Sequence, residues 1–270
     1  MTAQEKQAGM EPEALKQCCA RLYQSDLAKL LLGDSFHPGG LKLTERLAAI
    51  LRISPESRVL DAASGTGASA LFLAERYGCE VVGIDYSAQN VEQANQRDEV
   101  KRLAGRLRFE RADAESLPLP DASFDAVICE CSFCTFPDKS AAASEFARVL
   151  RPGGRVGISD VTRGPVLPQG LEGLLGWIAC LADAQSVDQY AAQLRASGLL
   201  VQDIEQHDKA LADLVHSIRK RLLGVEIMAG LGKIDLPKVD FASARQMALS
   251  ALTAIQQGQL GYAILCALKL

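Results

Sequence analysis

The sequence of 270 residues predicts an α/β fold, in which a doubly wound, mostly parallel sheet of seven strands is packed between helices. Two observations carry this prediction. From residue 58 onward, short apolar segments alternate with longer segments whose apolar residues recur at helical spacing. The first apolar segment also ends in a glycine-bearing turn that leads into a helix, which is typical of the first strand–helix turn in such sheets.

The expected elements follow this alternation along the chain. Two amphipathic helices, over residues 13–32 and 41–51, precede the sheet. The expected strands cover residues 58–63, 79–87, 107–115, 124–132, 155–161, 201–208 and 262–270. Helices are expected at residues 68–78, 88–105, 139–154 (ending in a Pro-Gly-Gly stop), 171–184, 187–198 and, between the last two strands, 209–257.

Composition excludes several classes of protein. Lys and Arg total 29 against 33 Asp and Glu, and the main basic cluster is Arg219-Lys220-Arg221, so we expect no nucleic-acid partner. No apolar run reaches the roughly 18 residues of a spanning helix, so no membrane partner is expected. The polar N-terminus lacks a signal-peptide core, which predicts a cytoplasmic protein whose eight cysteines stay reduced.

The turn after the first strand, DAASGTG at residues 61–67, is the most informative segment. Gly65 and Gly67 let the backbone approach a ligand closely because neither has a Cβ atom. Ala70 replaces the third glycine of a dinucleotide-binding turn, and no Lys-Ser/Thr pair follows, so a P-loop is excluded. A turn that serves only tight packing is the alternative interpretation.

Acidic residues also end the next two strands. The carboxylate of Asp85 can accept two hydrogen bonds from ribose hydroxyls, and Asp113-Ala114 is placed for the edge of an adenine. The structural alternatives are a first-turn helix acid for Asp85 and a loop cap for Asp113.

Together these segments resemble the class I S-adenosylmethionine-dependent methyltransferases. The resemblance covers residues 40–205 and rests on VLDAASGTG, VVGIDYS, ADAESLPLPDASFDAVIC and RVLRPGGRVGISD, in the family's order and spacing. One departure is Ala63, where the family usually has a glycine. The resemblance implies a Rossmann-like methyltransferase fold with S-adenosylmethionine as cofactor. It assigns cofactor contacts to Asp61, Ala63, Gly65, Gly67, Asp85, Tyr86, Asp113, Ala114 and, at the end of the fourth strand, Glu130.

Cysteines cluster where the methyl acceptor is expected. Cys129, Cys131 and Cys134 lie at the end of the fourth strand, and Cys180 follows the fifth. The arrangement resembles the arsenite methyltransferase branch of the family, which assigns Cys131, ahead of Pro-Asp-Lys, and Cys180, near a tryptophan, as catalytic thiols. Thiolates are soft ligands that suit trivalent arsenic.

The match to that branch is incomplete. The branch usually carries another cysteine just before the cofactor strand, but residues 33–40 contain none, and the pair Cys18-Cys19 lies earlier. The alternatives are that these thiols are small buried apolar residues, or that they hold a structural zinc ion or iron–sulfur cluster. We predict no metal ligands.

The sequence thus predicts three regions: an N-terminal helical lid (1–40), an S-adenosylmethionine-binding core (41–208), and a helical insertion with the last strand (209–270). The expected activity is methyl transfer to a small molecule, with arsenite or another soft, thiol-bound acceptor favoured. The alternatives are a carbon or oxygen methyltransferase of the quinone-biosynthesis type, or a non-catalytic cofactor- or metalloid-binding protein. His37 is expected to be a loop residue satisfied by its surroundings, with a contact to the acceptor or cofactor as the alternative, and the oligomeric state is left open.

Overall fold

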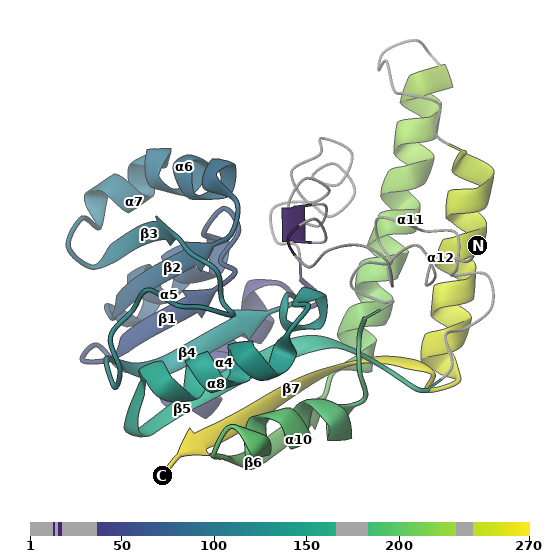
Figure 1. Ribbon diagram of the computed structural model, residues 1–270. Coiled ribbons are helices and arrows are strands. Elements are labelled where there is room, and N and C mark those ends of the chain that lie inside the picture. Colours follow the sequence, from purple (N-terminus) through teal and green to yellow (C-terminus); the bar gives the residue numbers. More distant parts are fainter. Residues whose placement is uncertain (1–12, 14–15, 18–36, 166–182, 231–239) are drawn as a thin grey trace.

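The computed structural model describes residues 13, 16–17, 37–165, 183–230 and 240–270, and these residues form a sheet of seven strands (Figure 1). The strand order is β3-β2-β1-β4-β5-β7-β6, which confirms the predicted α/β fold. The strands are β1 (Arg58–Ala62), β2 (Glu80–Asp85), β3 (Leu107–Arg111), β4 (Phe124–Glu130), β5 (Leu150–Arg163), β6 (Leu199–Gln206) and β7 (Leu260–Lys269).

Strands β1 to β5 run in parallel, because β1 pairs in parallel with β2 and β4, which pair in parallel with β3 and β5. Only β7 is antiparallel to its neighbours, β5 and β6. The ends of β1 to β5 therefore meet at one edge of the sheet, the carboxyl edge, and their beginnings at the opposite, amino edge. The chain order reverses beside β1, and ligands bind at the carboxyl edge of such sheets at this reversal.

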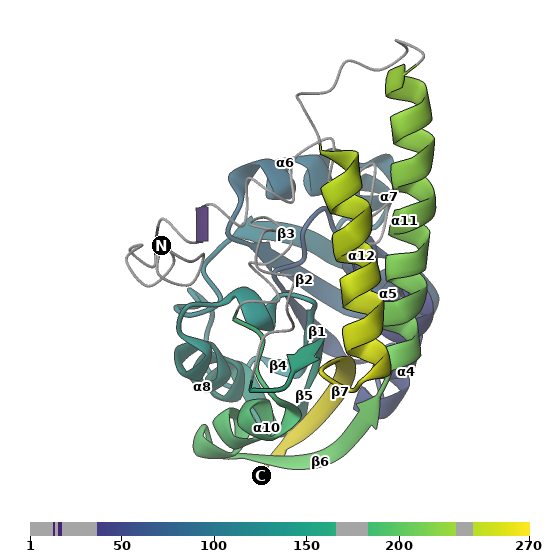
Figure 2. The ribbon, with the colours of Figure 1, turned by 90° about the vertical axis from the view of Figure 1, so that its right-hand side faces the viewer.

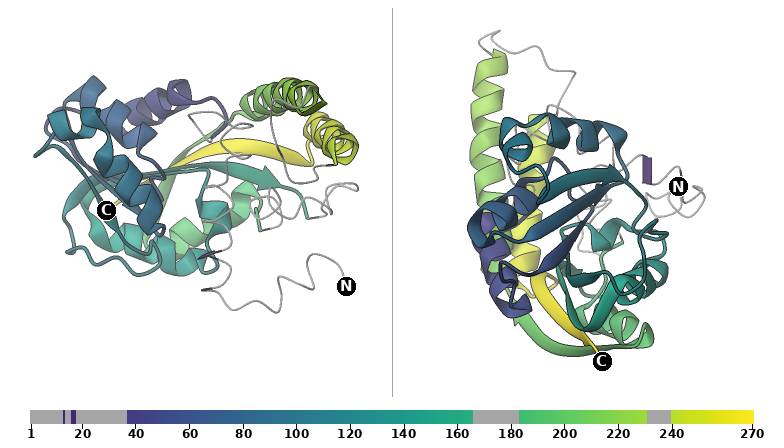
Figure 3. Two further views of the ribbon diagram at one scale, coloured as in Figure 1. Left: turned by 90° about the horizontal axis from the view of Figure 1, so that it is seen from above. Right: turned by 90° about the vertical axis from the view of Figure 1, so that its left-hand side faces the viewer.

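Helices cover both faces of the sheet (Figure 3). One face carries α4 (Leu41–Leu51), α5 (Ala68–Tyr77) and α6 (Ala88–Gln96), and the opposite face carries α8 (Lys139–Val149) and α10 (Val187–Ala196). Helix α4 is amphipathic, and its buried Leu47 and Leu51 lie over Gly157 of β5, where a Cβ atom would come within 2.5 Å of Leu47. A glycine in β5 thus allows the close approach of α4 to the sheet.

Two expected boundaries were wrong. The single helix expected over 88–105 is divided into α6 and α7 (Asp98–Arg102), because Arg97 adopts an extended conformation with ψ 134°. The helix expected to run to the Pro-Gly-Gly stop ends at Val149 instead. Leu150 already belongs to β5, since its fully buried side chain and its pairing with Phe124 place it in the sheet.

The expected helical stretch before the last strand forms two helices, α11 (Asp208–Gly230) and α12 (Phe241–Gln256), which lie side by side (Figure 2). Their buried residues recur at helical spacing, which places one stripe of α11 against its neighbours. That stripe comprises Leu211, Val215, Ile218, Leu222 and Val225. No helix in the described part of the chain is both long and apolar enough to cross a membrane.

Candidate active site

A cavity lies at the carboxyl edge, where β1, β2 and β4 end; we call it the edge cavity. The structure brings most of the sequence-predicted site residues together in its wall. The lining residues that were predicted are Asp61, Ala63, Gly65, Asp85, Tyr86, Asp113, Ala114, Glu130 and Cys131. Two predicted residues are missing from this set: Gly67 lies behind the wall, and Cys180 lies outside the described residues.

Asp61, near the end of β1, has an unsatisfied carboxylate oxygen. Its side chain is buried, with 2% of the residue exposed, and its Oδ2 atom has no hydrogen-bond partner in the part of the chain that the structure describes. Burial raises the pKa of Asp61 well above its ordinary value, and the nearby carboxylates of Glu130 and Asp85 raise it further. A buried acceptor without a hydrogen bond costs free energy, so a ligand that brings a hydrogen-bond donor or a cation to this oxygen would be stabilised there.

Asp85, at the end of β2, holds the glycine turn in place. Its Oδ2 atom accepts the backbone N–H of Gly65 at 2.8 Å, and its Oδ1 atom accepts the N–H of Ser87 at 2.8 Å and the amide of Asn90 at 3.1 Å. Burial nevertheless raises the pKa of Asp85, although these three bonds oppose the shift. The sequence indicated a ligand-facing carboxylate here, but not its second function as an anchor of the turn.

Glu130, at the end of β4, joins three other elements. Its carboxylate accepts the hydroxyl of Thr44 in α4 at 3.0 Å, that of Ser69 in α5 at 2.6 Å and that of Ser159 in β5 at 3.4 Å. The Nε2 atom of His37 lies 3.7 Å from the same carboxylate. With only 4% of its side chain exposed, Glu130 fixes the elements that surround the edge cavity.

The glycine turn contains three residues with positive φ, at Ala63 (58°), Gly65 (55°) and Gly67 (82°). A Cβ atom on Gly65 would meet nothing within 4 Å, whereas one on Gly67 would lie 2.3 Å from the ring of Phe109. Gly65 therefore leaves open space beside the cavity, as predicted for a ligand-approaching residue. Gly67 instead permits packing of Phe109 and does not line the cavity, so its predicted contact with the cofactor stays a prediction.

The end of the cavity near β3 carries the remaining predicted residues. Asp113 accepts the ammonium of Lys16 at 2.6 Å, and Lys16 also pairs with Glu115 at 2.5 Å. The hydroxyl of Tyr86 donates to Glu13. Two described residues from the N-terminal region thus contact the wall that was assigned to the ribose and adenine.

The thiols in and just after β4 (Cys129, Cys131 and Cys134) do not form a cluster facing the cavity. Cys131 lines it and is half-buried, with φ 52° and an N–H that donates to Ser159 at 2.7 Å. Cys129 and Cys134 are fully buried, and burial raises the pKa of Cys129 well above its ordinary value. Among the described residues, no group of three or more His, Cys, Asp or Glu side chains could hold a metal ion.

Sequence reasoning missed several residues of this site, although it did consider His37. His37 was expected to be satisfied within its loop, with a contact to acceptor or cofactor as the alternative; it is buried, lies near the Pro38 carbonyl and the Thr44 hydroxyl, and also lines the cavity. Ser64, which was not predicted, lines the cavity too, and its buried hydroxyl has no hydrogen-bond partner among the described residues. No local signal in the sequence marks Thr44 or Ser69, because their partner Glu130 is 86 and 61 residues away.

The cavity suits a positively charged ligand. Of the described residues, no lysine or arginine pairs with Asp61, Asp85 or Glu130, so three buried carboxylates converge without a strong cation. A sulfonium and an α-ammonium group would supply the missing charge, because an opposite charge nearby favours an ionised carboxylate. The open space at Gly65 and the unpaired Asp61 oxygen therefore fit S-adenosylmethionine.

Comparison with known proteins supports this conclusion. Residues 60–158 match the family described as a methyltransferase domain. The chain is 32% identical to 27-O-demethylrifamycin SV methyltransferase of Amycolatopsis mediterranei, over 91% of this chain and 93% of that protein. It is 47% identical to the demethylmenaquinone methyltransferase of Deinococcus radiodurans, over 40% of this chain and 44% of that one.

The solved structure of a Haemonchus contortus phosphoethanolamine N-methyltransferase with S-adenosyl-L-methionine has the same fold. It superposes with a TM-score of 0.78 at 19% identity, covering 94% of this chain and 60% of that one. The same family is indicated by the strand order, by the carboxylates at the carboxyl edge, by the matching domain family and by the full-length relative. The chain therefore belongs to the class I S-adenosylmethionine-dependent methyltransferases and acts on a small molecule.

Proposed function

We propose that the protein transfers the methyl group of S-adenosylmethionine to a hydroxyl oxygen of a small organic molecule. The observation that carries this proposal is the composition of the cavity wall: among the described residues, Cys131 is the single thiol that lines it. Soft trivalent arsenic needs several thiolate ligands, whereas a hydroxyl acceptor needs only a shaped, water-poor wall next to the reactive carbon.

In this proposal the carboxyl edge holds and orients the cofactor. The unpaired oxygen of Asp61 accepts the cofactor's α-ammonium, Asp85 faces the ribose, and Asp113 faces the adenine. When bound, the cofactor supplies a methyl group made electrophilic by its sulfonium. A lone pair on the acceptor oxygen forms the new C–O bond while the C–S bond breaks, and the electron pair of the C–S bond stays on sulfur. The hydroxyl proton leaves to water or to a base.

Relatives support an organic acceptor. The full-length relative is named for a 27-O-demethylrifamycin substrate, and a second relative, from Pyrenophora dematioidea, is named an O-methyltransferase at 31% identity. The demethylmenaquinone methyltransferase match favours the quinone-type alternative over the arsenite expectation. None of these names refers to a metalloid.

The arsenite expectation keeps one supporting feature, the position of Cys131 in the cavity wall. Its two neighbouring thiols, Cys129 and Cys134, are fully buried, so they act as core residues. The other assigned thiol, Cys180, lies outside the described residues and stays a prediction.

Transfer of a labelled methyl group separates the two acceptors. The purified protein is incubated with radiolabelled S-adenosylmethionine and, in parallel, with a panel of phenols and hydroquinones or with arsenite plus glutathione. We expect label in a phenol or hydroquinone ether, and we expect Cys131→Ser to retain this activity because serine is nearly isosteric. Cys79→Ser is the matched control, since Cys79 is a buried thiol outside the cavity wall. The proposal would be refuted if label appeared only in methylarsenicals and was lost in Cys131→Ser. Label on a ring carbon would show that the acceptor atom is carbon and not oxygen.

A further inference from the structure

Lys139 occupies a position where a lysine is unfavourable. It is the first residue of α8, and only 3% of its side chain is exposed. The start of a helix carries partial positive charge, and burial takes the ammonium out of water, so both features oppose a lysine there. Helix propensity and solvation therefore do not explain this residue, and positions that break such local rules are expected at functional sites.

The ammonium of Lys139 joins two segments that are distant in sequence. It donates to the carbonyl oxygen of Phe136 at 2.9 Å, and it forms an ion pair with Asp183, which lies 44 residues after it. Phe136 belongs to the segment between β4 and α8, residues 131–138, which we call the β4 loop. Lys139 thus connects the β4 loop to the segment that leads into α10.

The β4 loop forms part of the wall of the edge cavity, through Cys131, Ser132, Thr135 and Phe136. In the sheet, β4 lies on the side of β1 opposite to β2 and β3, the strands whose ends were assigned to the ribose and the adenine. The β4 loop therefore begins at the part of the cavity that remains for the methyl group and its acceptor.

Buried groups hold the β4 loop at further points. The backbone N–H of Cys134 donates to the Oδ2 atom of Asp160 in β5 at 2.9 Å, and Asp160 is fully buried. Burial raises the pKa of Asp160, while hydrogen bonds from Cys134 and the positive charge of Lys139 oppose the rise. The ring of Phe136 packs edge-on against that of the fully buried Phe133, with centroids 5.8 Å apart. The loop is thus fixed at Cys134 and at Phe136.

The contacts of Lys139 are separate from those predicted for the cofactor. Neither Lys139 nor Asp183 lines the edge cavity, and the carboxylates assigned to the cofactor belong to β1, β2 and the segment after β3. Loss of the ammonium should therefore displace the wall beside the acceptor and leave the cofactor carboxylates in place. Such a displacement matters, because a shift of about 1 Å can lower a reaction rate about 100-fold.

We propose that Lys139 is a positioning residue for methyl transfer: its contacts with Phe136 and Asp183 hold the β4 loop so that the acceptor hydroxyl lies in line with the reactive methyl group. This inference rests on the proposed function and adds to it a residue that lines no part of the edge cavity. Asp183 supports the same role, because it supplies the charge that balances the buried ammonium.

The first test replaces Lys139 by methionine, which has an unbranched chain of similar length and no charge. Methyl transfer is measured with saturating S-adenosylmethionine and with the phenol or hydroquinone that the wild type methylates fastest. We expect kcat to fall at least about tenfold, while the dissociation constant of S-adenosylhomocysteine, measured by calorimetry, changes less than about twofold. An unchanged kcat, or a loss of cofactor affinity as large as the loss of kcat, would overturn the inference.

Lys269 in β7 offers a matched control. Its ammonium also donates to backbone carbonyls, those of Leu150 at 2.7 Å and of Arg148 at 3.4 Å, but Lys269 does not line the edge cavity. Lys269→Met should therefore lower the midpoint of urea unfolding and keep kcat within about twofold of wild type. Equal losses of kcat in the two lysine variants would show that Lys139 has only a structural role.

Asp183→Asn provides a test even if Lys139→Met does not fold. Because asparagine keeps an oxygen that can accept from the ammonium, the chain should stay folded while the charge of the ion pair is lost. We expect kcat to fall about threefold or more, with cofactor affinity unchanged. Hydrogen exchange at the amides of Cys134 and Phe136 should be faster, while the amide of Gly65, which donates to Asp85, should exchange as in wild type. Normal kcat or unchanged exchange in the β4 loop would contradict the proposed role.

Failure of the proposed function has a different signature. The wild type would then transfer label to no hydroxyl compound of the panel. Failure of the present inference alone would leave transfer by the wild type intact and give Lys139→Met and Asp183→Asn the same kcat as wild type.

Discussion

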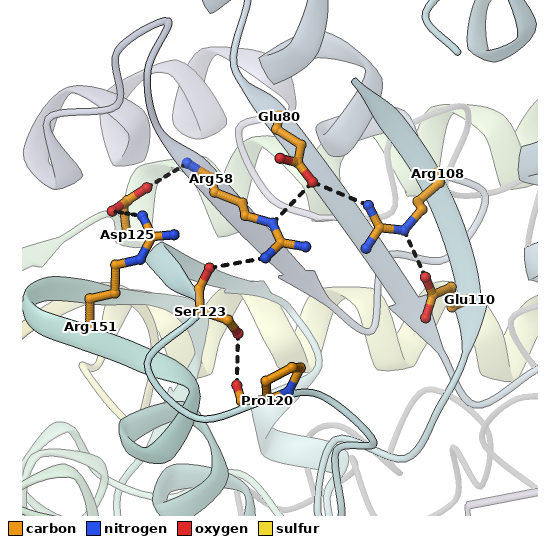
Figure 4. A network of polar contacts seen from close by, with 8 residues as sticks. All are labelled: Arg58, Glu80, Arg108, Glu110, Pro120, Ser123, Asp125 and Arg151. Atoms are coloured by element: carbon orange, nitrogen blue, oxygen red, sulfur yellow. Dashed lines mark hydrogen bonds and ion pairs between the residues drawn. The ribbon is translucent and has the colours of Figure 1, made fainter. Parts of the chain in front are cut away.

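The two edges of the same sheet use acidic residues in opposite ways. At the amino edge, Glu80 at the start of β2 pairs with Arg58 at 3.0 Å and with Arg108 at 3.2 Å (Figure 4). Asp125 at the start of β4 accepts the backbone N–H of Arg58 and pairs with Arg151, both at 2.7 Å. Both of these acids have an arginine partner, and all of these side chains are partly exposed.

The same two strands end in acids that lack such partners. Asp85 ends β2 and Glu130 ends β4. At the carboxyl edge, Asp61 and Asp85 are buried, and only 4% of the Glu130 side chain is exposed. Among the described residues, none of these three pairs with a lysine or an arginine. Burial raises the pKa values of Asp61 and Asp85, because the charged form of each carboxyl group is less well solvated there than in water.

This difference separates a structural edge from a ligand-binding edge. Partly exposed ion pairs contribute little to stability, but they satisfy their charges without help. Buried carboxylates without a cation lower the stability of the ligand-free protein, and a positively charged cofactor removes that cost when it binds. A substitution that neutralises an acid should therefore have opposite consequences at the two edges.

The largest effect is expected on cofactor affinity at Asp61. Asp61→Asn keeps the shape and removes the charge, so charge-assisted bonds worth about 1.5–3 kcal/mol are lost, and the dissociation constant of S-adenosylmethionine should rise about 10–100-fold. Calorimetric titration measures this change. Asp125→Asn at the amino edge is the control and should bind normally. Equal affinities of Asp61→Asn and wild type would show that the cofactor does not use this carboxylate.

The same Asp61→Asn variant should be more stable than wild type without ligand. Because burial raises the pKa of Asp61, the folded state favours the protonated acid; stability is greatest below the ordinary value of 3.8 and is lost as pH rises above it. The uncharged amide escapes this loss, so we expect a gain of about 1–3 kcal/mol at pH 7.5 that shrinks toward pH 4. Urea unfolding at both pH values tests the prediction, and a gain that is larger in acid would contradict it.

At the amino edge, Glu80→Gln should lower the stability of the ligand-free protein, by less than Asp61→Asn raises it. It removes the ion pairs with Arg58 and Arg108, and since 37% of the Glu80 side chain is exposed, the loss should stay below about 1 kcal/mol. Salt should reduce the loss further, because exposed pairs are screened. Urea unfolding at low and high salt is the measurement, with S-adenosylhomocysteine affinity expected to be unchanged. A salt-independent loss of several kcal/mol would remove the distinction between the edges.

Sequence patterns predicted what depends on neighbours along the chain. The alternation of strands and helices, the glycine turn at residues 61–67 and the acids that end β2 and β4 were all visible. The orientation of the β4 thiols was not visible: Cys129 lies in a central strand that is buried on both faces, where alternation carries no signal. The expectation of a multi-thiol acceptor site arose from this ambiguity.

Other features depend on contacts that no local pattern encodes. Glu130 accepts hydrogen bonds from hydroxyls of α4, α5 and β5, three elements that are far apart in the sequence. The packing role of Gly67 was not visible for the same reason, because the ring of Phe109 that requires a glycine there comes from β3. Sequence motifs predicted the ligand-facing positions, and tertiary packing decides which of them line the cavity.

The smallest predicted effect concerns backbone strain at the carboxyl edge. Ala63 adopts φ 58°, a left-handed conformation that costs an L-residue about 1 kcal/mol, and glycine would relieve it. Glycine also gains conformational freedom in the unfolded chain, and this offsets about 0.5–1 kcal/mol of the stability gained by relieving the strain. We therefore expect Ala63→Gly to change stability by no more than about 0.5 kcal/mol. The neighbouring Ala62→Gly is the matched control: Ala62 is fully buried in β1, so its replacement should destabilise by about 1 kcal/mol. Urea unfolding of both variants compares them directly, and equal losses would show that Ala63 is not strained.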